Sequence, residues 1–183
     1  MPRLPEVLDR NALPEDKRQI HDYLASTRGE VRLPFSAILN SPEIASRMAH
    51  LGTYIRFEGV LPKAVTELAT LTVSREHNSR LEWAIHHGFA EKAGVSEAAL
   101  DAIAYKKPLD GLDDAEAFPI AYARELLTTH KLLDETVTAA QERFGVQGVI
   151  ELTATVGYYS MMACLIAAIE AVPAATAPQL PEL

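Results

Sequence analysis

The sequence predicts an all-α protein, and three features of the 183-residue chain support that fold class. Apolar residues recur at intervals of three and four over most of the length, which is the period of one buried helix face. Proline and serine repeatedly stand where they favour the start of a helix. No run of alternating apolar and polar residues indicates a strand, and a hydrophobic fraction of 48% is sufficient for a folded core.

Two helices are expected in the first third of the chain. Residues 14–27 form the first, and a link that contains glycine and proline follows it. Residues 41–56 form the second, because a serine N-cap and a proline at the first helical position open it. On this second helix we expect Ile44, Met48 and Leu51 to face inward.

Six further helical segments are expected after residue 60. Each begins near a proline, serine, aspartate or glycine and continues with apolar residues at helical spacing. The segments are 62–78, 79–93, 97–105, 113–130, 134–144 and 146–171.

The ends of the chain are rich in proline, which predicts arms that leave a compact middle. Residues 1–30 are expected to form an N-terminal arm and helix. Residues 31–172 form the helical domain, and residues 173–183 form a flexible C-terminal tail.

The formal net charge of -8 disfavours nucleic acid as a partner, because no excess of Lys and Arg is present to replace the counterions of a phosphate backbone. Proline and charged residues interrupt the N-terminal segment, so it does not resemble a signal peptide, and we expect a cytoplasmic protein. Residues 152–169 carry no charge over nearly the length of a membrane span. We expect a buried helix there and no membrane, because the segment is rich in Thr, Ser, Gly and Ala and has no flanking basic cluster.

The segment 79–93 places polar residues on its apolar side. With a rotation of about 100° per residue, Ser79, Trp83 and His86 fall on one side of the helix, and Glu82 adjoins them. A carboxylate and an imidazole one turn apart in an apolar setting are partly desolvated, which shifts the pKa of each group. His86 is therefore a candidate proton donor or acceptor with Glu82 as its partner.

Structural interpretations of the same residues stay open. Ser-x-x-Glu after a helix break is also the capping-box pattern, in which Ser79 and Glu82 satisfy each other's backbone N–H groups. His86 would then be a core histidine bonded to Glu82. A metal site is disfavoured, because His87 is rotated by about 100° from His86 and one helix offers too few ligands.

The spacing around these residues resembles that of the carboxymuconolactone decarboxylase family, whose relatives include alkylhydroperoxidase D-like proteins. Redox members of the family carry a glutamate, eleven residues, Cys-x-x-Cys, three residues and a histidine. The same register in this chain holds Glu67, Ser79-Arg80-Leu81-Glu82 and His86. The phrases AEKAGVSEAAL and VIELTATVGYYSMMACL are also similar to the family. The resemblance extends over residues 30–170 or so and indicates a Glu-Trp-x-x-His branch that lacks both cysteines.

The resemblance implies a compact multi-helix domain of the alkylhydroperoxidase D-like type, with about six to eight helices. It implies a homodimer, trimer or hexamer, and neither a metal nor an organic cofactor. It further implies that the substrate is a small molecule, a carboxylated lactone or related acid that is decarboxylated or isomerised. Such chemistry requires chiefly a proton donor and a way to hold the acid.

We therefore favour a carboxy-lyase-like enzyme in which His86 protonates the substrate and Glu82 or Glu67 sets the tautomer of the imidazole. An arginine would hold the substrate carboxylate. The substrate-binding candidates are Ser79, Trp83, Arg75 and Arg80.

Two alternatives belong to other functional classes. A non-catalytic oligomer could bind a small anion at the start of the motif helix, where backbone N–H groups are free. A thiol peroxidase of the peroxiredoxin type is disfavoured, because its cycle needs one thiolate to attack and a second to resolve, and the chain has Cys164 alone. Cys164 lies in an apolar segment, so we expect it to be an inert core residue.

Overall fold

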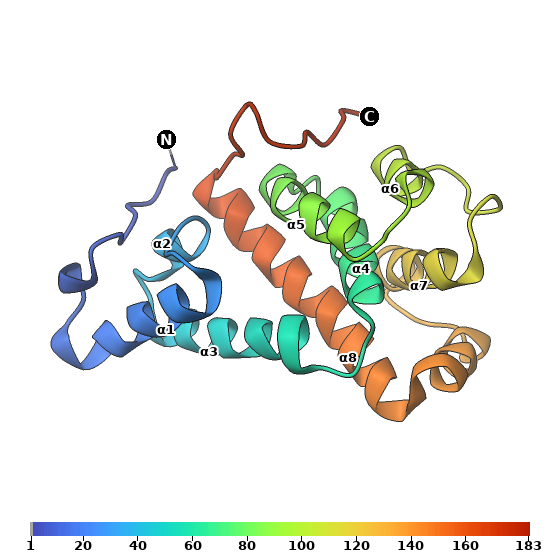
Figure 1. Cartoon of the computed structure of the whole chain (residues 1–183), viewed down its shortest axis with the longest axis horizontal. Helices are drawn as coiled ribbons and strands as arrows, with labels where there is room; N and C mark the ends of the chain where they lie inside the picture. The colour runs from blue at the N-terminus through green and yellow to red at the C-terminus, as the bar shows by residue number, and fades with distance from the viewer. Residues whose placement is uncertain (1) are drawn as a thin grey trace. The chain divides into compact units, whose positions relative to one another are not determined.

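The computed structural model describes residues 2–183 and confirms the all-α class, because no strand occurs over this range. Short 3-10 turns, η1 (Arg10–Ala12) and η2 (Glu15–Lys17), precede the first α-helix, and a π-helical segment, η3 (Tyr54–Glu58), continues α3. The α-helices are α1 (Arg18–Arg28), α2 (Phe35–Ile38), α3 (Pro42–Thr53), α4 (Lys63–Glu76), α5 (Arg80–Lys92), α6 (Glu97–Ala104), α7 (Asp114–Thr129) and α8 (Asp134–Ile169), as Figure 1 shows.

The described residues form two compact units. Unit 1 comprises the chain up to residue 58 together with residues 165–172, and unit 2 comprises residues 59–164 and 173–183. This division differs from the expected boundaries at residues 30 and 172. Helix α8 contributes its last residues to unit 1 and the rest to unit 2.

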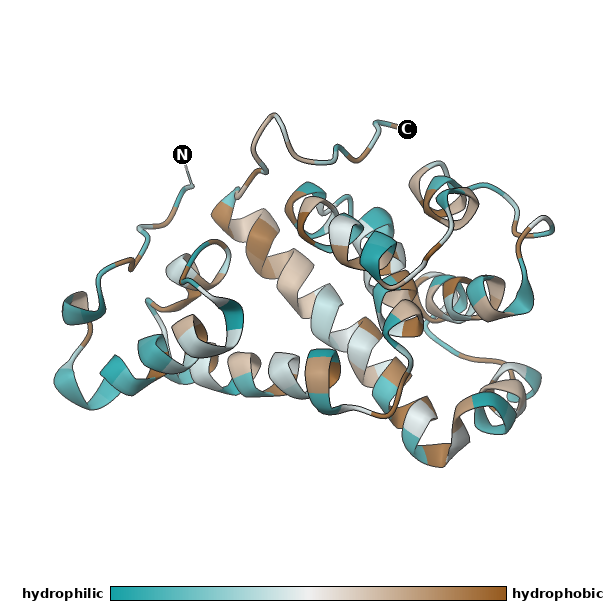
Figure 2. Cartoon of the chain, viewed as in Figure 1, coloured by the Kyte–Doolittle hydropathy of each residue, from teal (hydrophilic) through white to brown (hydrophobic). Residues whose placement is uncertain are grey.

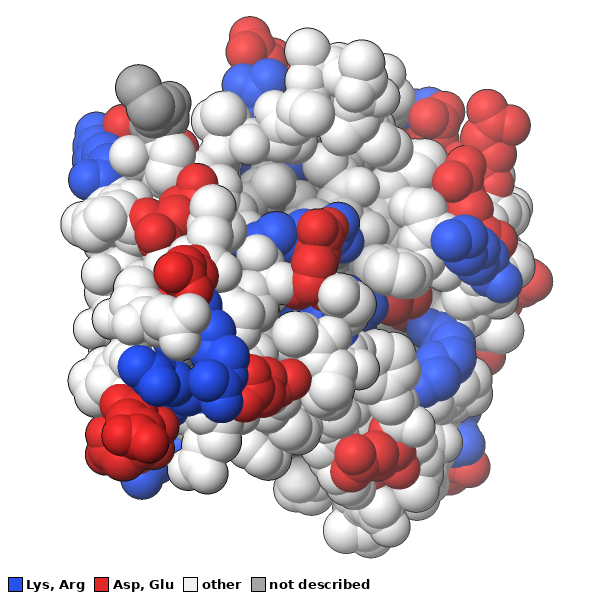
Figure 3. Space-filling model, turned by 60° about the vertical axis from the view of Figure 1, so that its left-hand side comes forward, with Lys and Arg blue, Asp and Glu red and all other residues white. Residues whose placement is uncertain are grey.

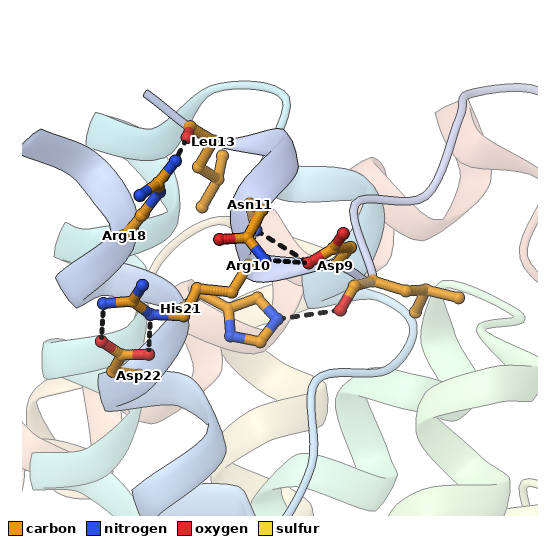
Figure 4. A network of polar contacts seen from close by, with 8 residues as sticks. Asp9, Arg10, Asn11, Leu13, Arg18, His21 and Asp22 are labelled. Carbon is orange, nitrogen blue, oxygen red and sulfur yellow. Dashed lines mark hydrogen bonds and ion pairs between the residues drawn. The ribbon is translucent and has the colours of Figure 1, made fainter. Parts of the chain in front are cut away.

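The N-terminal arm in unit 1 is tied to α1 by polar contacts, which Figure 4 shows. Nε and Nη2 of Arg10 donate to the two carboxylate oxygens of Asp22 at 2.6 and 2.9 Å. The ring of His21 contacts the carbonyl oxygen of Leu8 at 3.0 Å. These bonds give residues 8–12 a fixed position against the helix that follows them.

The inward face of α3 differs from the expected one. Met48 is buried as expected, but Ile44 and Leu51 are exposed. The buried face also contains Ala45 and Ala49, whose small side chains permit close packing against α1 and α2. Ile44 and Leu51, which stand seven positions apart and share a face, therefore lie on the exposed side of α3.

Helix α4 is the central element of unit 2. Every residue from Val65 to Arg75 is buried, and α4 packs mainly against α5 and α7, with α6 at one end. A helix that is surrounded on all sides carries its polar residues into the interior. Glu67 is one of those polar residues, so the packing of α4 determines that this carboxylate is buried.

Helix α8 combines two predicted helices across a break. Gly145 has φ 68° and ψ 175°, so the expected interruption between residues 144 and 146 is present. Figure 2 shows white to brown residues along much of α8. Among the described residues α8 is the one helix long and apolar enough to cross a membrane, but half of its most apolar window is buried, as in a core helix.

Residues 173–183, for which we expected a flexible tail, lie in unit 2. Leu180 is buried in the core of that unit, and the carbonyl oxygen of Pro181 accepts a 2.7 Å hydrogen bond from Nη1 of Arg75. An apolar anchor and a charged donor thus hold a segment whose composition alone indicates disorder.

Charged side chains of both signs lie intermixed on the molecular face in Figure 3. Several are paired in the structure, such as Lys17 with Glu43 at 2.7 Å in unit 1. This face offers no continuous basic surface of the kind that binds a phosphate backbone.

Candidate functional site: a buried Glu-His-Glu cluster

A tight turn brings α4 and α5 together. Asn78 adopts a left-handed conformation with φ 51°, and the N–H of Ser79 donates to the carbonyl oxygen of Ser74 at 2.7 Å. The two helices then pack against each other along their lengths. Glu67 on α4 and His86 on α5 are thereby placed face to face, although 19 positions separate them in sequence.

His86 lies between two carboxylates. Its Nδ1 is 2.7 Å from Oε2 of Glu67, and its Nε2 is 3.3 Å from Oε2 of Glu82. The exposed fractions are 3% for His86, 3% for Glu82 and 8% for Glu67. The structure thus brings together the three side chains for which acid–base chemistry was expected.

The contacts on both ring nitrogens determine the protonation state of His86. A neutral imidazole has a hydrogen on one nitrogen and a lone pair on the other, so one carboxylate would face a lone pair. The imidazolium donates to both carboxylates. Burial lowers the pKa of His86, but the hydrogen bonds and negative charges of Glu67 and Glu82 outweigh it and raise the pKa from 6.5 to about 9.

Two aromatic rings cover the imidazole. The ring of Tyr159 on α8 meets it edge-on at 4.8 Å between centroids, and the ring of Phe89 lies 5.8 Å away. Tyr159 was missed from sequence, because a tyrosine within a long uncharged stretch gives no sign of which helix it meets. The rings exclude water, so the charges of the cluster interact more strongly than they would in solvent.

The expected capping box at the start of α5 is not formed. Ser79 occupies the N-cap position, but its side chain makes no cap hydrogen bond, and Glu82 is turned toward His86. The hydroxyl oxygen of Ser79 is buried and has no hydrogen-bond partner among residues 2–183. The first turn of α5 therefore retains a free hydroxyl beside backbone N–H groups that lack intrahelical acceptors.

The other expected substrate-binding residues lie apart from the cluster. Arg75 is buried and donates to the carbonyl oxygens of Ala104 and Pro181 and to the side chain of Asn78. Arg80 is exposed, with Gln179 as a neighbour at 3.5 Å. Neither guanidinium contacts His86 in the hydrogen bonds and ion pairs that the structure describes.

Trp83 is buried on another flank of α5, where its ring lies 5.7 Å from that of His87. Cys164 is exposed on α8, which corrects the expectation of a core thiol. Among the described residues no group of three or more His, Cys, Asp or Glu side chains is arranged to hold a metal ion.

Residues 42–125 match the family model described as the carboxymuconolactone decarboxylase family. Over these residues the chain is similar to that family. The matched region includes Glu67, Ser79, Glu82 and His86, so the whole Glu-His-Glu cluster lies within the part of the chain that is similar to the family. No curated protein matches the chain significantly.

Proposed function

We propose that this protein is a carboxymuconolactone decarboxylase-like, cofactor-independent proton-transfer enzyme that decarboxylates or isomerises a small carboxylated lactone or related acid. The observation that carries the proposal is an imidazole whose two nitrogens both face buried carboxylates. In this arrangement His86 is a charged acid at neutral pH, and Glu67 holds its orientation through the shorter contact.

The decarboxylation follows from this arrangement. The bond between the ring carbon and the substrate carboxylate breaks, CO2 leaves, and the electron pair enters the conjugated lactone. The carbon then forms a C–H bond with the proton on Nε2 of His86, the nitrogen whose 3.3 Å contact is the longer one. The lone pair left on Nε2 faces Glu82, which favours uptake of a proton from solvent, so the cycle consumes one proton and releases CO2.

An isomerisation uses the same groups in another order. Glu82 accepts a proton from the carbon next to a carbonyl, and His86 returns a proton at the far end of the conjugated system. No net proton is consumed, which distinguishes this reaction from decarboxylation.

Substrate oxygens would be held at the start of α5. Arg75 and Arg80 are engaged elsewhere, whereas the Ser79 hydroxyl is buried and unpartnered within the described chain. A hydroxyl and free N–H groups at the positive end of a helix favour an anionic or partly negative oxygen. Ser79→Ala should therefore raise KM more than it lowers kcat.

Turnover of small carboxylated lactones in D2O tests the proposal. We expect CO2 release and one deuterium in the product, and His86→Gln should reduce kcat by about 10²- to 10⁴-fold, the usual contribution of a general acid. His77→Gln, which alters an exposed histidine at the end of α4, serves as the matched control. Undiminished turnover by His86→Gln, or no turnover of any compound in the panel, would contradict the proposal.

A non-catalytic member that binds a small anion is the second candidate, favoured by the unpartnered Ser79 hydroxyl. In that case His86→Ala would lower the melting temperature and no activity would be found to lose. A peroxidase would need a second thiol beside Cys164, so we expect no peroxide consumption, and a comparison with Cys164→Ser checks this.

We also propose that the protein self-associates and that it is cytoplasmic. Exposed Val146, Ile150, Gly157 and Met161 form an uncharged face of α8, with each residue at helical spacing from the next. Such a face is suited to a second copy of the chain, as a dimer, trimer or hexamer. Sedimentation of the wild type and of Ile150→Lys measures how much this face contributes to self-association.

A further inference from the structure

Tyr159 on α8 contacts the imidazole of His86 from a helix that carries neither carboxylate of the cluster. The two rings meet edge-on, with 4.8 Å between their centroids and 80° between their planes. Phe89 also lies against the imidazole, but it belongs to α5, the helix of His86 itself. Tyr159 therefore ties the imidazole to a third helix of unit 2, whereas Glu67 ties it to α4.

The ring of Tyr159 is itself held in place. Tyr159 is 2% exposed, and its neighbour Tyr158 is 4% exposed. The rings of these two residues are nearly perpendicular, at 88°, with 5.1 Å between their centroids. Buried side chains interdigitate with few voids, so a ring in this setting has one preferred position. A phenol ring fixed in this way leaves the neighbouring imidazole little room to turn.

The two carboxylates do not by themselves determine the direction of Nε2. The 2.7 Å contact between Nδ1 and Glu67 is short and fixes one end of the imidazole, whereas the 3.3 Å contact between Nε2 and Glu82 is long for a hydrogen bond. The ring could therefore swing about its Nδ1 end unless packing prevents that motion. The perpendicular ring of Tyr159 supplies the packing.

We infer that Tyr159 is a positioning residue for His86, because its ring keeps Nε2 aimed at Glu82 and at the substrate carbon that receives the proton. The inference rests on the proposed function, in which Nε2 donates that proton. Tyr159 does not exchange a proton with the substrate, so its effect should appear in the rate of the chemical step and not in substrate binding. A displacement of about 1 Å in a reacting group can lower the rate about 100-fold, so the position of this ring matters.

Steady-state kinetics of two variants measures this effect. Tyr159→Met keeps most of the apolar volume but removes the flat ring, and it should lower kcat about tenfold with KM changed less than about twofold. Tyr159→Phe keeps the ring and should retain kcat within about twofold. Tyr105→Met makes the same exchange at an exposed tyrosine of unit 2 and is the control. Equal kcat for Tyr159→Met and the wild type would overturn the inference.

A second measurement needs no substrate and separates this inference from the proposed function. The proton between Nδ1 of His86 and Glu67 lies in a short, charge-assisted hydrogen bond, so it should give a far-downfield proton NMR signal in the full-length protein. Loss of the signal in His86→Gln identifies it. We expect the signal in the wild type, in Tyr159→Phe and in Tyr105→Met. In Tyr159→Met it should broaden or disappear, because a ring that can swing opens the bond to exchange with water.

The outcomes of the NMR experiment are distinct. A sharp signal in folded Tyr159→Met, or no signal in the wild type, would overturn the inference. Loss of the signal in Tyr159→Phe would also overturn it, because the effect would then belong to the hydroxyl and not to the ring. Circular dichroism checks that each variant is folded, and Tyr159→Leu replaces Tyr159→Met if the latter does not fold. A signal that behaves as expected in a protein without turnover would contradict the proposed function alone.

Discussion

The stability of the protein should depend on pH through His86. The pKa of this residue is raised from 6.5 to about 9 by its two carboxylate partners. A group whose pKa is higher in the folded than in the unfolded state stabilises the fold fully below its unfolded pKa, near 6.5. That contribution is lost as pH rises through about 9.

The size of the effect follows from the same pKa values. A rise from 6.5 to about 9, at about 1.4 kcal/mol for each pH unit, corresponds to about 3 kcal/mol of stability at low pH. His86 is almost fully buried, so solvent screens the interaction little. The perturbation is His86→Gln, which keeps a polar side chain of similar reach but cannot become charged.

Urea denaturation of both proteins between pH 6 and 10 measures this contribution. The difference in the free energy of unfolding should fall by about 3 kcal/mol across that range. Other ionisable groups titrate in both proteins and largely cancel in the difference. His77→Gln, at an exposed position outside the cluster, is the control variant. If the difference stays flat, or grows with pH, His86 is not a buried imidazolium and the assignment of its protonation state is wrong.

Two other sets of variants test the surroundings. Glu67→Gln should lower the pKa of His86, because less negative charge then opposes the effect of burial. Glu82→Gln should lower this pKa less, because its contact with the imidazole is longer. The chemical shifts of the His86 ring protons, followed against pH, measure the pKa in both variants. Gly145→Ala should destabilise the fold by about 1–3 kcal/mol, because a side chain is strained at φ 68° and ψ 175°, whereas Gly88→Ala, in a helical position of α5 without a clash, should be neutral or slightly stabilising in the same denaturation assay.

The sequence predicted helix positions well, because each boundary depends on local chemistry. The proline at the start of α3 and the glycine at position 145 act through their own backbone preferences. The polar residues on the buried side of α5 followed from helical periodicity alone. The family spacing then indicated Glu67 as a partner, and the structure places it 2.7 Å from His86.

Features that depend on packing between helices could not be predicted. Ile44 and Leu51 carry the right periodicity for burial, but the small residues of α3 form its buried face. Ser79 and Glu82 have the spacing of a capping box, but an imidazole competes for the carboxylate. Tyr159 reaches His86 from a distant segment. The helices that pack on α3 and the ring of Tyr159 lie outside the local sequence, whereas at the start of α5 two local interactions compete for the same carboxylate.

The bond between Arg75 and Pro181 connects the interior to a segment 106 positions further along the chain. The guanidinium is buried on α4, the same helix that carries Glu67. A protease that cuts within residues 173–177 would free the Pro181 carbonyl oxygen from the Arg75 guanidinium. Because that guanidinium is buried and would lose a hydrogen-bond acceptor, α4 would have to change its packing. The C-terminal segment therefore helps to hold the helix that positions Glu67, although neither Arg75 nor Pro181 contacts His86 in the described hydrogen bonds.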